Sequence, residues 1–248
     1  MRNWFAGFGG QRRPGPAIPS PNIWHWPDIY ERENTAQDAD GAIWAVLREL
    51  APWAGADILD IGCGDGYHLP LFAADARSVI GVEPHPPLVE RARARVAELT
   101  GVRVFQAGAA ALPLSDRSVD VAHARTAYFF GPGCEAGLTE VDRVLRPGGA
   151  LAIVDLDFTA APYGDWLRAD LPRYDPASVE GFFAERGFTM RRVPTVWRFT
   201  DRPTLEAVLR IEFSAAVAER AIATTPGLTI PVGYRVHVRR RPTGVVSA

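Results

Sequence analysis

The sequence predicts an α/β domain whose mostly parallel sheet is covered by helices on both faces. Short apolar runs alternate with amphipathic stretches from residue 57 onward, which is the pattern of strands joined by crossover helices. The chain has 248 residues, of which 47% are hydrophobic, enough for one complete core. A glycine-rich segment, Gly62 to Gly66, directly follows the first apolar run. Glycines at that point allow a tight turn and let backbone N–H groups approach a ligand.

The individual elements follow from apolar periodicity and from the breaks between them. Strands are expected at 57–61, 78–83, 102–107, 118–124, 150–155, 188–196 and 234–240. Helices are expected at 66–75, 86–99, 135–145, 177–186 and 204–221, with a break at 147–149 where proline is followed by two glycines.

The amino-terminal part is expected to differ from the rest. Residues 1–22 are rich in glycine and proline and predict a flexible arm, which could also cover a pocket with its aromatic side chains. Residues 23–50 predict a helical cap of two helices, separated near Asn34 and Thr35. The main domain then spans 51–248, with additions at 158–175 and 198–230. Because loops above the carboxyl ends of the strands usually select the ligand, these additions and the cap are expected to determine the substrate.

Composition limits the partners. The chain has 27 basic and 29 acidic residues, a net charge of −2, so no overall field attracts nucleic acid or an anionic membrane. It has two cysteines, Cys63 and Cys134, and no apolar run of about 20 residues. We therefore expect a cytoplasmic protein that acts on a small molecule. The sequence leaves a homodimer open.

The glycine segment carries the strongest functional signal. In Asp60-Ile61-Gly62-Cys63-Gly64-Asp65-Gly66 the third glycine comes one residue earlier than in the dinucleotide fingerprint, which disfavours a nicotinamide cofactor. The pattern resembles the first motif of class I S-adenosylmethionine-dependent methyltransferases, in particular the small-molecule enzymes of the methyltransferase type 11 kind. Residues 140–149 similarly resemble the family's helix and turn before its fifth strand. The resemblance covers roughly residues 50–190 and implies a Rossmann-like, seven-stranded sheet whose last strand is antiparallel.

The resemblance also implies the cofactor, S-adenosyl-L-methionine, and the residues that hold it. Asp60 would meet the methionine ammonium, and Glu83 at the end of the second strand would accept both ribose hydroxyls. Many relatives have an aspartate for the adenine amino group where this chain has Gly108, so adenine would rest on the main chain and on Pro84. The full set expected at the cofactor is Tyr30, Asp60, Gly62, Cys63, Gly64, Gly66, His68, Glu83, Pro84, Gly108, Ala109, Ala110 and His123.

Candidates for the chemistry lie where strand ends and cap converge. They are His25, His123, Arg125 and Tyr128. His25, between two tryptophans, and His123, in phase with a buried strand, could each act as a base or only pack in the core. Arg125 could bind a carboxylate through two hydrogen bonds or pair with a nearby acid. Asp155 and Asp157 lack a third oxygen ligand after the fourth strand, so no metal is expected.

The sequence therefore predicts transfer of a methyl group to oxygen or nitrogen of a small aromatic or apolar metabolite. Positioning can supply most of this catalysis, and a base is needed only for acceptors that are protonated at neutral pH. The alternative is a non-catalytic module or regulator that binds the same cofactor. A nucleotide-dependent oxidoreductase is a third hypothesis, from another enzyme class.

Overall fold

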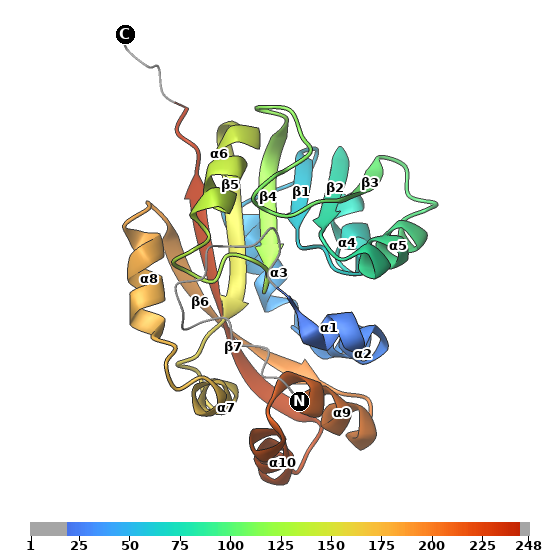
Figure 1. Cartoon of the computed structure of the whole chain (residues 1–248), viewed down its shortest axis with the longest axis vertical. Helices are drawn as coiled ribbons and strands as arrows, with labels where there is room; N and C mark the ends of the chain where they lie inside the picture. The colour runs from blue at the N-terminus through green and yellow to red at the C-terminus, as the bar shows by residue number, and fades with distance from the viewer. Residues whose placement is uncertain (1–18, 244–248) are drawn as a thin grey trace.

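A computed structural model describes residues 19–243 of the chain. A seven-stranded sheet with strand order β3-β2-β1-β4-β5-β7-β6 runs through its centre (Figure 1). The strands β1 to β5 pair in parallel, and β7 pairs antiparallel with both β5 and β6. The predicted seven-stranded, mostly parallel sheet is thus confirmed. The strands are β1 (Asp57–Ile61), β2 (Ser78–Glu83), β3 (Val102–Gln106), β4 (Val119–Arg125), β5 (Leu145–Leu156), β6 (Thr189–Arg198) and β7 (Thr229–Arg240).

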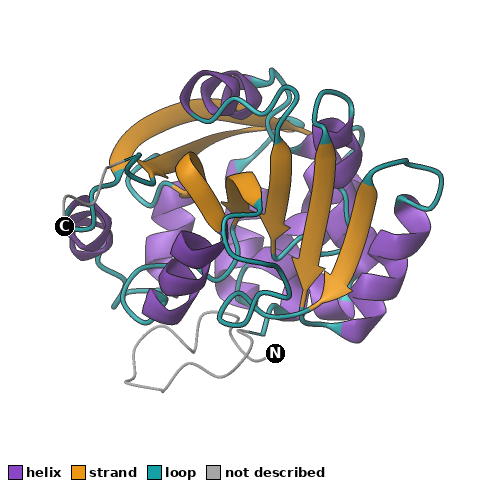
Figure 2. Cartoon of the chain, turned by 90° about the horizontal axis from the view of Figure 1, so that it is seen from above, coloured by secondary structure: helices purple, strands orange, loops and turns teal. Residues whose placement is uncertain are grey.

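Helices pack on both faces of this sheet (Figure 2). On one face α3 (Ala42–Leu50), α4 (Leu69–Ala73) and α5 (Pro86–Arg95) bury apolar side chains against the strands. On the other face α6 (Glu135–Val144) and α8 (Pro176–Ala184) do the same. The alternation of β1 explains how one strand serves both layers, since Ile58 joins the first core and Leu59 and Ile61 join the second.

The cap consists of three helices, α1 (Pro21–His25), α2 (Pro27–Ala36) and α3. The expected break near Asn34 and Thr35 is wrong, because α2 continues through both residues and the chain turns at 37–41. Asp38 has φ 48° and Gly41 has φ 72° in this turn, and the Asp38 carboxylate accepts the Ile43 N–H at 3.0 Å. The expected arm also ends earlier than residue 22, because Asn22 lies in α1 and is buried. Residues 1–18 of that arm lie outside the described residues.

Three further elements differ from the expectation. Residues 147–149 follow the end of α6 as expected and interrupt the pairing of β5 with β4, but they lie within β5 itself. Gly148 N–H donates to the Arg241 carbonyl and Arg241 N–H donates to the Gly149 carbonyl. The expected helix at 204–221 is two helices, α9 (Arg202–Glu212) and α10 (Ala215–Thr224), since Ser214 N–H bonds the Asp170 carboxylate. The addition at 158–175 contains the helix α7 (Tyr163–Asp170).

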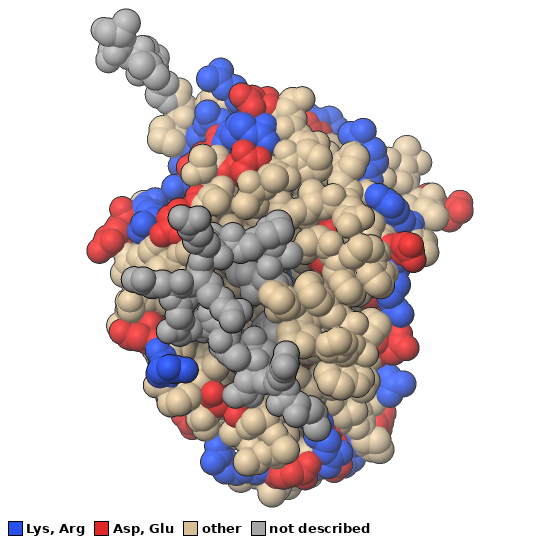
Figure 3. All heavy atoms as spheres, in the orientation of Figure 1, with Lys and Arg blue, Asp and Glu red and all other residues tan. Residues whose placement is uncertain are grey.

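The cap and the additions meet beyond the carboxyl ends of the strands. Helix α2 packs on α9, and α10 packs on both α9 and α7. On the face shown in Figure 3, acidic and basic side chains are interspersed. Between residues 19 and 243, no helix is long and apolar enough to cross a bilayer.

Candidate functional site

The loop after β1 is shaped by three glycines, each at positive φ. Gly62 has φ 72°, and a β-carbon on it would lie 2.5 Å from the Ala127 Cβ, so only glycine fits. A β-carbon on Gly64 would meet Ile23 of the cap at 2.9 Å, and one on Gly66 would meet the Ala92 Cα of α5 at 3.1 Å. Gly62 and Gly64 line a cavity of about 110 Å³, whereas Gly66 packs the loop against α5.

Glu83 closes β2 and lies beside this loop. Its carboxylate accepts the Gly64 N–H at 3.2 Å and the His85 N–H at 2.9 Å, and the side chain is 5% exposed. Burial raises the pKa of Glu83 to about 7, against the lowering effect of these two N–H groups. This carboxyl group lines the cavity and is half ionised near neutral pH. It is therefore well placed to accept hydrogen bonds from hydroxyl groups of a ligand.

The far end of the cavity is formed by main chain and small side chains. Pro84 and the segment 107–109 line it, and Ala107 N–H donates to the Glu83 carbonyl at 3.1 Å. Ala110 does not line it, although the sequence placed it there. From the cap, Trp24 stacks on His85 with ring centroids 4.3 Å apart. This end therefore offers a flat aromatic wall and backbone hydrogen-bonding groups, in keeping with the absence of an acid at Gly108.

The opposite end lies between the cap and the residues after β4. Tyr30 and Asn34 of α2 face it, together with Arg125 and Tyr128. Thr126 and Tyr128 have φ 45° and 55°, so the chain turns sharply as it leaves the strand. Burial raises the pKa of Tyr30 well above its usual value, and burial also raises that of Tyr128. Both phenols are therefore neutral hydrogen-bonding groups at neutral pH.

His68 is the histidine among the described residues that lines the cavity. Its ring packs against Trp44 and Tyr67, with centroids 5.4 and 5.2 Å apart. Burial lowers the pKa of His68 well below its usual value, and the positive charge of Arg125 lowers it further. The imidazole is thus uncharged at neutral pH, and it is a weak base.

Two of the four expected catalytic residues lie elsewhere. His123 is 1% exposed, and its Nδ1 lies 2.7 Å from the Asp60 carboxylate. Neither residue lines the cavity, so His123 is a core residue and Asp60 faces it from the neighbouring strand. His25 is exposed, packs edge-on against Trp26 and also lies outside the cavity. Arg125 and Tyr128 remain as candidates.

The sequence analysis missed part of the lining and a pair of buried acids behind it. The lining residues not anticipated include Ile23, Asn34, Asp65, Tyr67, Thr126 and Ala127. Behind Tyr30, Glu33 and Glu212 are 2% and 6% exposed. A signal existed in α2, where Tyr30, Glu33, Asn34 and Gln37 recur at helical spacing and give one polar stripe. Glu212 comes from α9, and no local pattern links it to α2.

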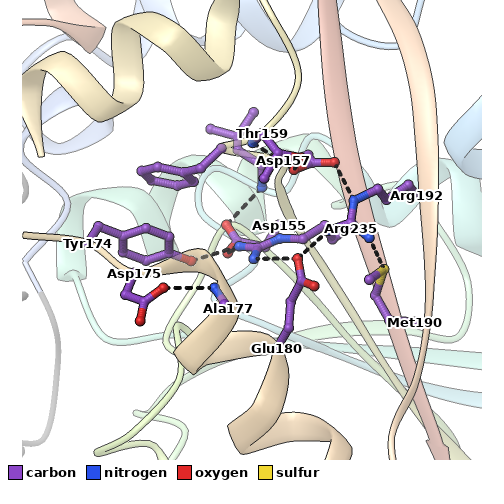
Figure 4. A network of polar contacts seen from close by, with 12 residues as sticks. Asp155, Asp157, Thr159, Tyr174, Asp175, Ala177, Glu180, Met190, Arg192 and Arg235 are labelled. Atoms are coloured by element: carbon purple, nitrogen blue, oxygen red, sulfur yellow. Dashed lines mark hydrogen bonds and ion pairs between the residues drawn. The ribbon is translucent and has the colours of Figure 1, made fainter. Parts of the chain in front are cut away.

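Figure 4 shows how the acids at the end of β5 are used. The Asp155 carboxylate lies 3.0 Å from Arg235, which is fully buried, and Arg235 also bonds the Tyr174 hydroxyl at 2.7 Å. Asp157 pairs with Arg192 at 3.0 Å. Both aspartates are thus neutralised by arginine, and within residues 19–243 no group of three or more acidic, histidine or cysteine side chains could hold a metal ion.

Comparisons with known proteins agree with this geometry. Residues 58–149 match the family model described as a methyltransferase domain. The chain is similar to an arsenite methyltransferase of Halobacterium salinarum, with 33% identity over 167 residues that cover 62% of this chain and 41% of the relative. It is also similar to an O-methyltransferase of Pyrenophora dematioidea, with 34% identity covering 54% of this chain and 52% of the relative. The chain thus spans about half, or less, of these relatives.

The fold is also found among solved structures. The YcgJ protein of Bacillus subtilis superimposes with a TM-score of 0.59 at 19% identity, covering 83% of this chain and all of that one. The glycine loop at positive φ and the acid at the end of β2 lie within the matched region. Residues 58–149 thus match a methyltransferase domain, and the chain shares the fold of these solved structures.

Proposed function

We propose that this protein transfers a methyl group from S-adenosylmethionine to oxygen or nitrogen of a small aromatic acceptor. The observation that carries the proposal is the cavity, which joins the bare main chain of Gly62 and Gly64 to the Glu83 carboxylate. The match of residues 58–149 to the methyltransferase domain supports the same cofactor.

Each part of the cavity has a distinct task in this proposal. Glu83 accepts the ribose hydroxyls, the segment 107–109 and Pro84 hold the adenine, and Gly62 and Gly64 leave room for the methionine. When bound, S-adenosylmethionine would supply a methyl group activated by the positively charged sulfur. Tyr30, Tyr67 and Tyr128 surround the acceptor, orient it and exclude water.

Oxygen and nitrogen are favoured over arsenic, the acceptor named for one relative. A soft metalloid is bound by thiolates, and this chain has two cysteines. Burial raises the pKa of Cys63 well above its usual value and that of Cys134 to about 12, so both are thiols at neutral pH. Five aromatic side chains line the cavity instead, namely Trp24, Tyr30, Tyr67, Tyr128 and Phe130. An aromatic acceptor fits this lining.

The second candidate is a module that binds the cofactor without transferring its methyl group. It is favoured by the low proton affinity of His68, which would serve poorly as a base. Incubation with methyl-labelled S-adenosylmethionine and a panel of phenols and amines separates the two candidates. A labelled product supports methyl transfer. Tight binding of S-adenosylmethionine, with no labelled product from any acceptor class or from a cell extract, supports the non-catalytic module.

The cofactor site itself is tested by a pair of matched glycine variants. Gly62 and Gly55 have nearly equal φ, 72° and 69°, but a β-carbon is blocked at Gly62 and meets nothing within 4 Å at Gly55. We expect Gly62→Ala to bind S-adenosylhomocysteine about tenfold or more weakly, because overpacking costs about 1–3 kcal/mol. Gly55→Ala should bind like the unchanged protein in isothermal titration. Equal affinity of both variants, or no binding by the unchanged protein, would contradict the proposed site.

A further inference from the structure

Arg125 is a buried cation at the edge of the cavity. It is the last residue of β4, where it pairs with Val154 of β5, and it points to the same side of the sheet as His123. The side chain is 8% exposed and lines the cavity beside Tyr30 and Thr126. A guanidinium in this position is removed from bulk water and faces the space that a ligand would fill.

The protein supplies this guanidinium with neutral neighbours. Its Nη2 donates to the Gln37 Oε1 at 2.7 Å, and the group lies 5.2 Å from the centre of the Tyr234 ring. Its Nε has no hydrogen-bond acceptor. Within residues 19–243 no carboxylate oxygen lies within 4.0 Å of its nitrogens, and the segments 1–18 and 244–248 contain no aspartate or glutamate. Arg125 therefore has no acidic side chain as an ion-pair partner.

Arg235, the other deeply buried arginine among the described residues, is paired with acidic side chains. Arg235 is fully buried, with Asp155 at 3.0 Å and Glu180 at 3.5 Å. An unpaired buried charge costs several kcal/mol, so structural arginines are paired in this way. The unpaired state of Arg125 indicates a partner that comes from outside the chain.

The acids nearest to Arg125, Glu33 and Glu212, form hydrogen bonds with other side chains and do not pair with Arg125. Gln37 stands between them, because its Nε2 donates to the Glu33 Oε1 at 2.7 Å while its Oε1 accepts from Arg125. Burial raises the pKa of Glu33 well above its usual value, and the neighbouring Glu212 raises it further. Burial and the neighbouring Glu212 thus favour the protonated, uncharged form of Glu33. Its partner Glu212 is bonded by Asn22 at 2.5 Å and by the Tyr163 hydroxyl at 3.3 Å.

We propose that Arg125, oriented by Gln37, binds a carboxylate of a ligand in this cavity. The planar guanidinium matches a carboxylate through two parallel hydrogen bonds, and the unpaired Nε is available for one of them. This inference rests on the proposed function, which gives two sources for the carboxylate. One is the methionine end of the cofactor, and the other is an acidic group on the aromatic acceptor.

The first arm of the test concerns the cofactor. Binding of S-adenosylhomocysteine and of 5′-methylthioadenosine, which lacks the amino-acid end, is measured by calorimetry in the unchanged protein and in Arg125→Gln. If the cofactor brings the carboxylate, the variant binds S-adenosylhomocysteine about tenfold to a hundredfold more weakly, as for loss of a charged hydrogen bond. Its affinity for 5′-methylthioadenosine stays the same.

The second arm concerns the acceptor. The probes are 4-hydroxybenzoate and 4-hydroxybenzamide, which differ in charge but hardly in shape, measured with and without S-adenosylhomocysteine. If the acceptor brings the carboxylate, the unchanged protein binds the benzoate at least about tenfold more tightly than the benzamide, and Arg125→Gln abolishes this preference. A selective loss in either arm supports the inference and names the source. Absence of any selective loss in both arms overturns it.

Controls separate binding from folding. Arg198→Gln removes an exposed arginine that pairs with Asp40 at 3.2 Å, and it should change neither arm. Arg125→Lys keeps the charge and should retain part of the carboxylate preference. A structural role for Arg125 predicts instead that Arg125→Gln lowers the midpoint of thermal unfolding and leaves both ligand ratios unchanged. Failure of S-adenosylhomocysteine to bind the unchanged protein counts against the proposed function, whereas the benzoate arm still tests Arg125.

Discussion

Two halves of the carboxyl edge of the sheet are built in different ways. The loop half, residues 60–68 with 83–85 and 107–110, offers backbone N–H groups, glycines and the Glu83 carboxyl group to the cavity. The outer half, where β5, β6 and β7 meet α2, α7 and α9, is held by buried charged side chains. Its hydrogen bonds join residues far apart in sequence, such as Asn22 with Glu212 and Asp155 with Arg235.

The difference explains which part of the molecule a sequence can predict. A backbone site needs particular residues within a few positions of one another, because glycine must stand where φ is positive and space is short. A site made of buried charges requires only that acidic and basic side chains come into contact after folding, so no local spacing in the sequence marks it. The loop half should therefore tolerate charge changes elsewhere, and the outer half should be sensitive to each of its own charges.

The largest expected effect is on the Asp155–Arg235 pair of the outer half. In Asp155→Asn the buried Arg235 loses its nearest carboxylate and keeps the Tyr174 hydroxyl at 2.7 Å and Glu180 at 3.5 Å, and the free energy of unfolding should fall by about 3–5 kcal/mol. Asp40→Asn is the control, because its pair with Arg198 is exposed on both sides and contributes about 0–1 kcal/mol. Chemical denaturation measures both. Equal stability of the two variants would show that the outer half does not depend on its buried charges.

A smaller effect is expected from Glu83 in the loop half. In the proposed site the ionised form of Glu83 would accept hydrogen bonds from the ribose hydroxyls, and its pKa is about 7 in the free protein. Below that pH the group must first lose a proton, so affinity for S-adenosylhomocysteine should fall about tenfold from pH 8 to pH 6. Glu83→Gln should bind more weakly and without this pH dependence. Titration at three pH values checks this, with Glu49→Gln, an exposed acid, as control. A Glu83→Gln protein that keeps the pH dependence would exclude Glu83 as its cause.

The smallest effect concerns the acid pair between cap and additions. Burial and the neighbouring Glu212 raise the pKa of Glu33 above its unfolded value, so its stabilising effect is complete at low pH and is lost as pH rises through the raised pKa. Glu33→Gln imitates the neutral acid at every pH. We expect it to unfold about 2–4 °C higher than the unchanged protein at pH 9, and at nearly the same temperature at pH 5. A lower midpoint for Glu33→Gln at pH 9 would contradict the raised pKa of Glu33.

The sequence predicted the loop half well and the outer half poorly, for reasons visible in single residues. Gly62, Gly64 and Glu83 could be recognised because their spacing alone is distinctive, and all three line the cavity. His123 and Arg125 lie on one side of one strand, and no pattern tells that the first meets Asp60 while the second remains unpaired. That difference depends on the side chains supplied by α2 and β1.

The helix boundaries show the same limit. The single helix expected at 204–221 is divided because Ser214 bonds Asp170, which lies 44 residues earlier in the chain. The expected break at 147–149 interrupts only the pairing of β5 with β4, because Arg241, directly after β7, bonds Gly148 and Gly149 and keeps them in β5. In both places a distant partner overrides a correct local preference.

The central claim is that the loop half holds the adenosyl and methionine groups of S-adenosylmethionine. A crystal structure with S-adenosylhomocysteine tests it most directly. We expect both ribose hydroxyls within hydrogen-bonding distance of the Glu83 carboxylate, the adenine beside 107–109, and the sulfur between Gly62 and Tyr128. A complex with the adenosine bound outside this cavity, or with Glu83 still bonded only to Gly64 and His85, would contradict the account.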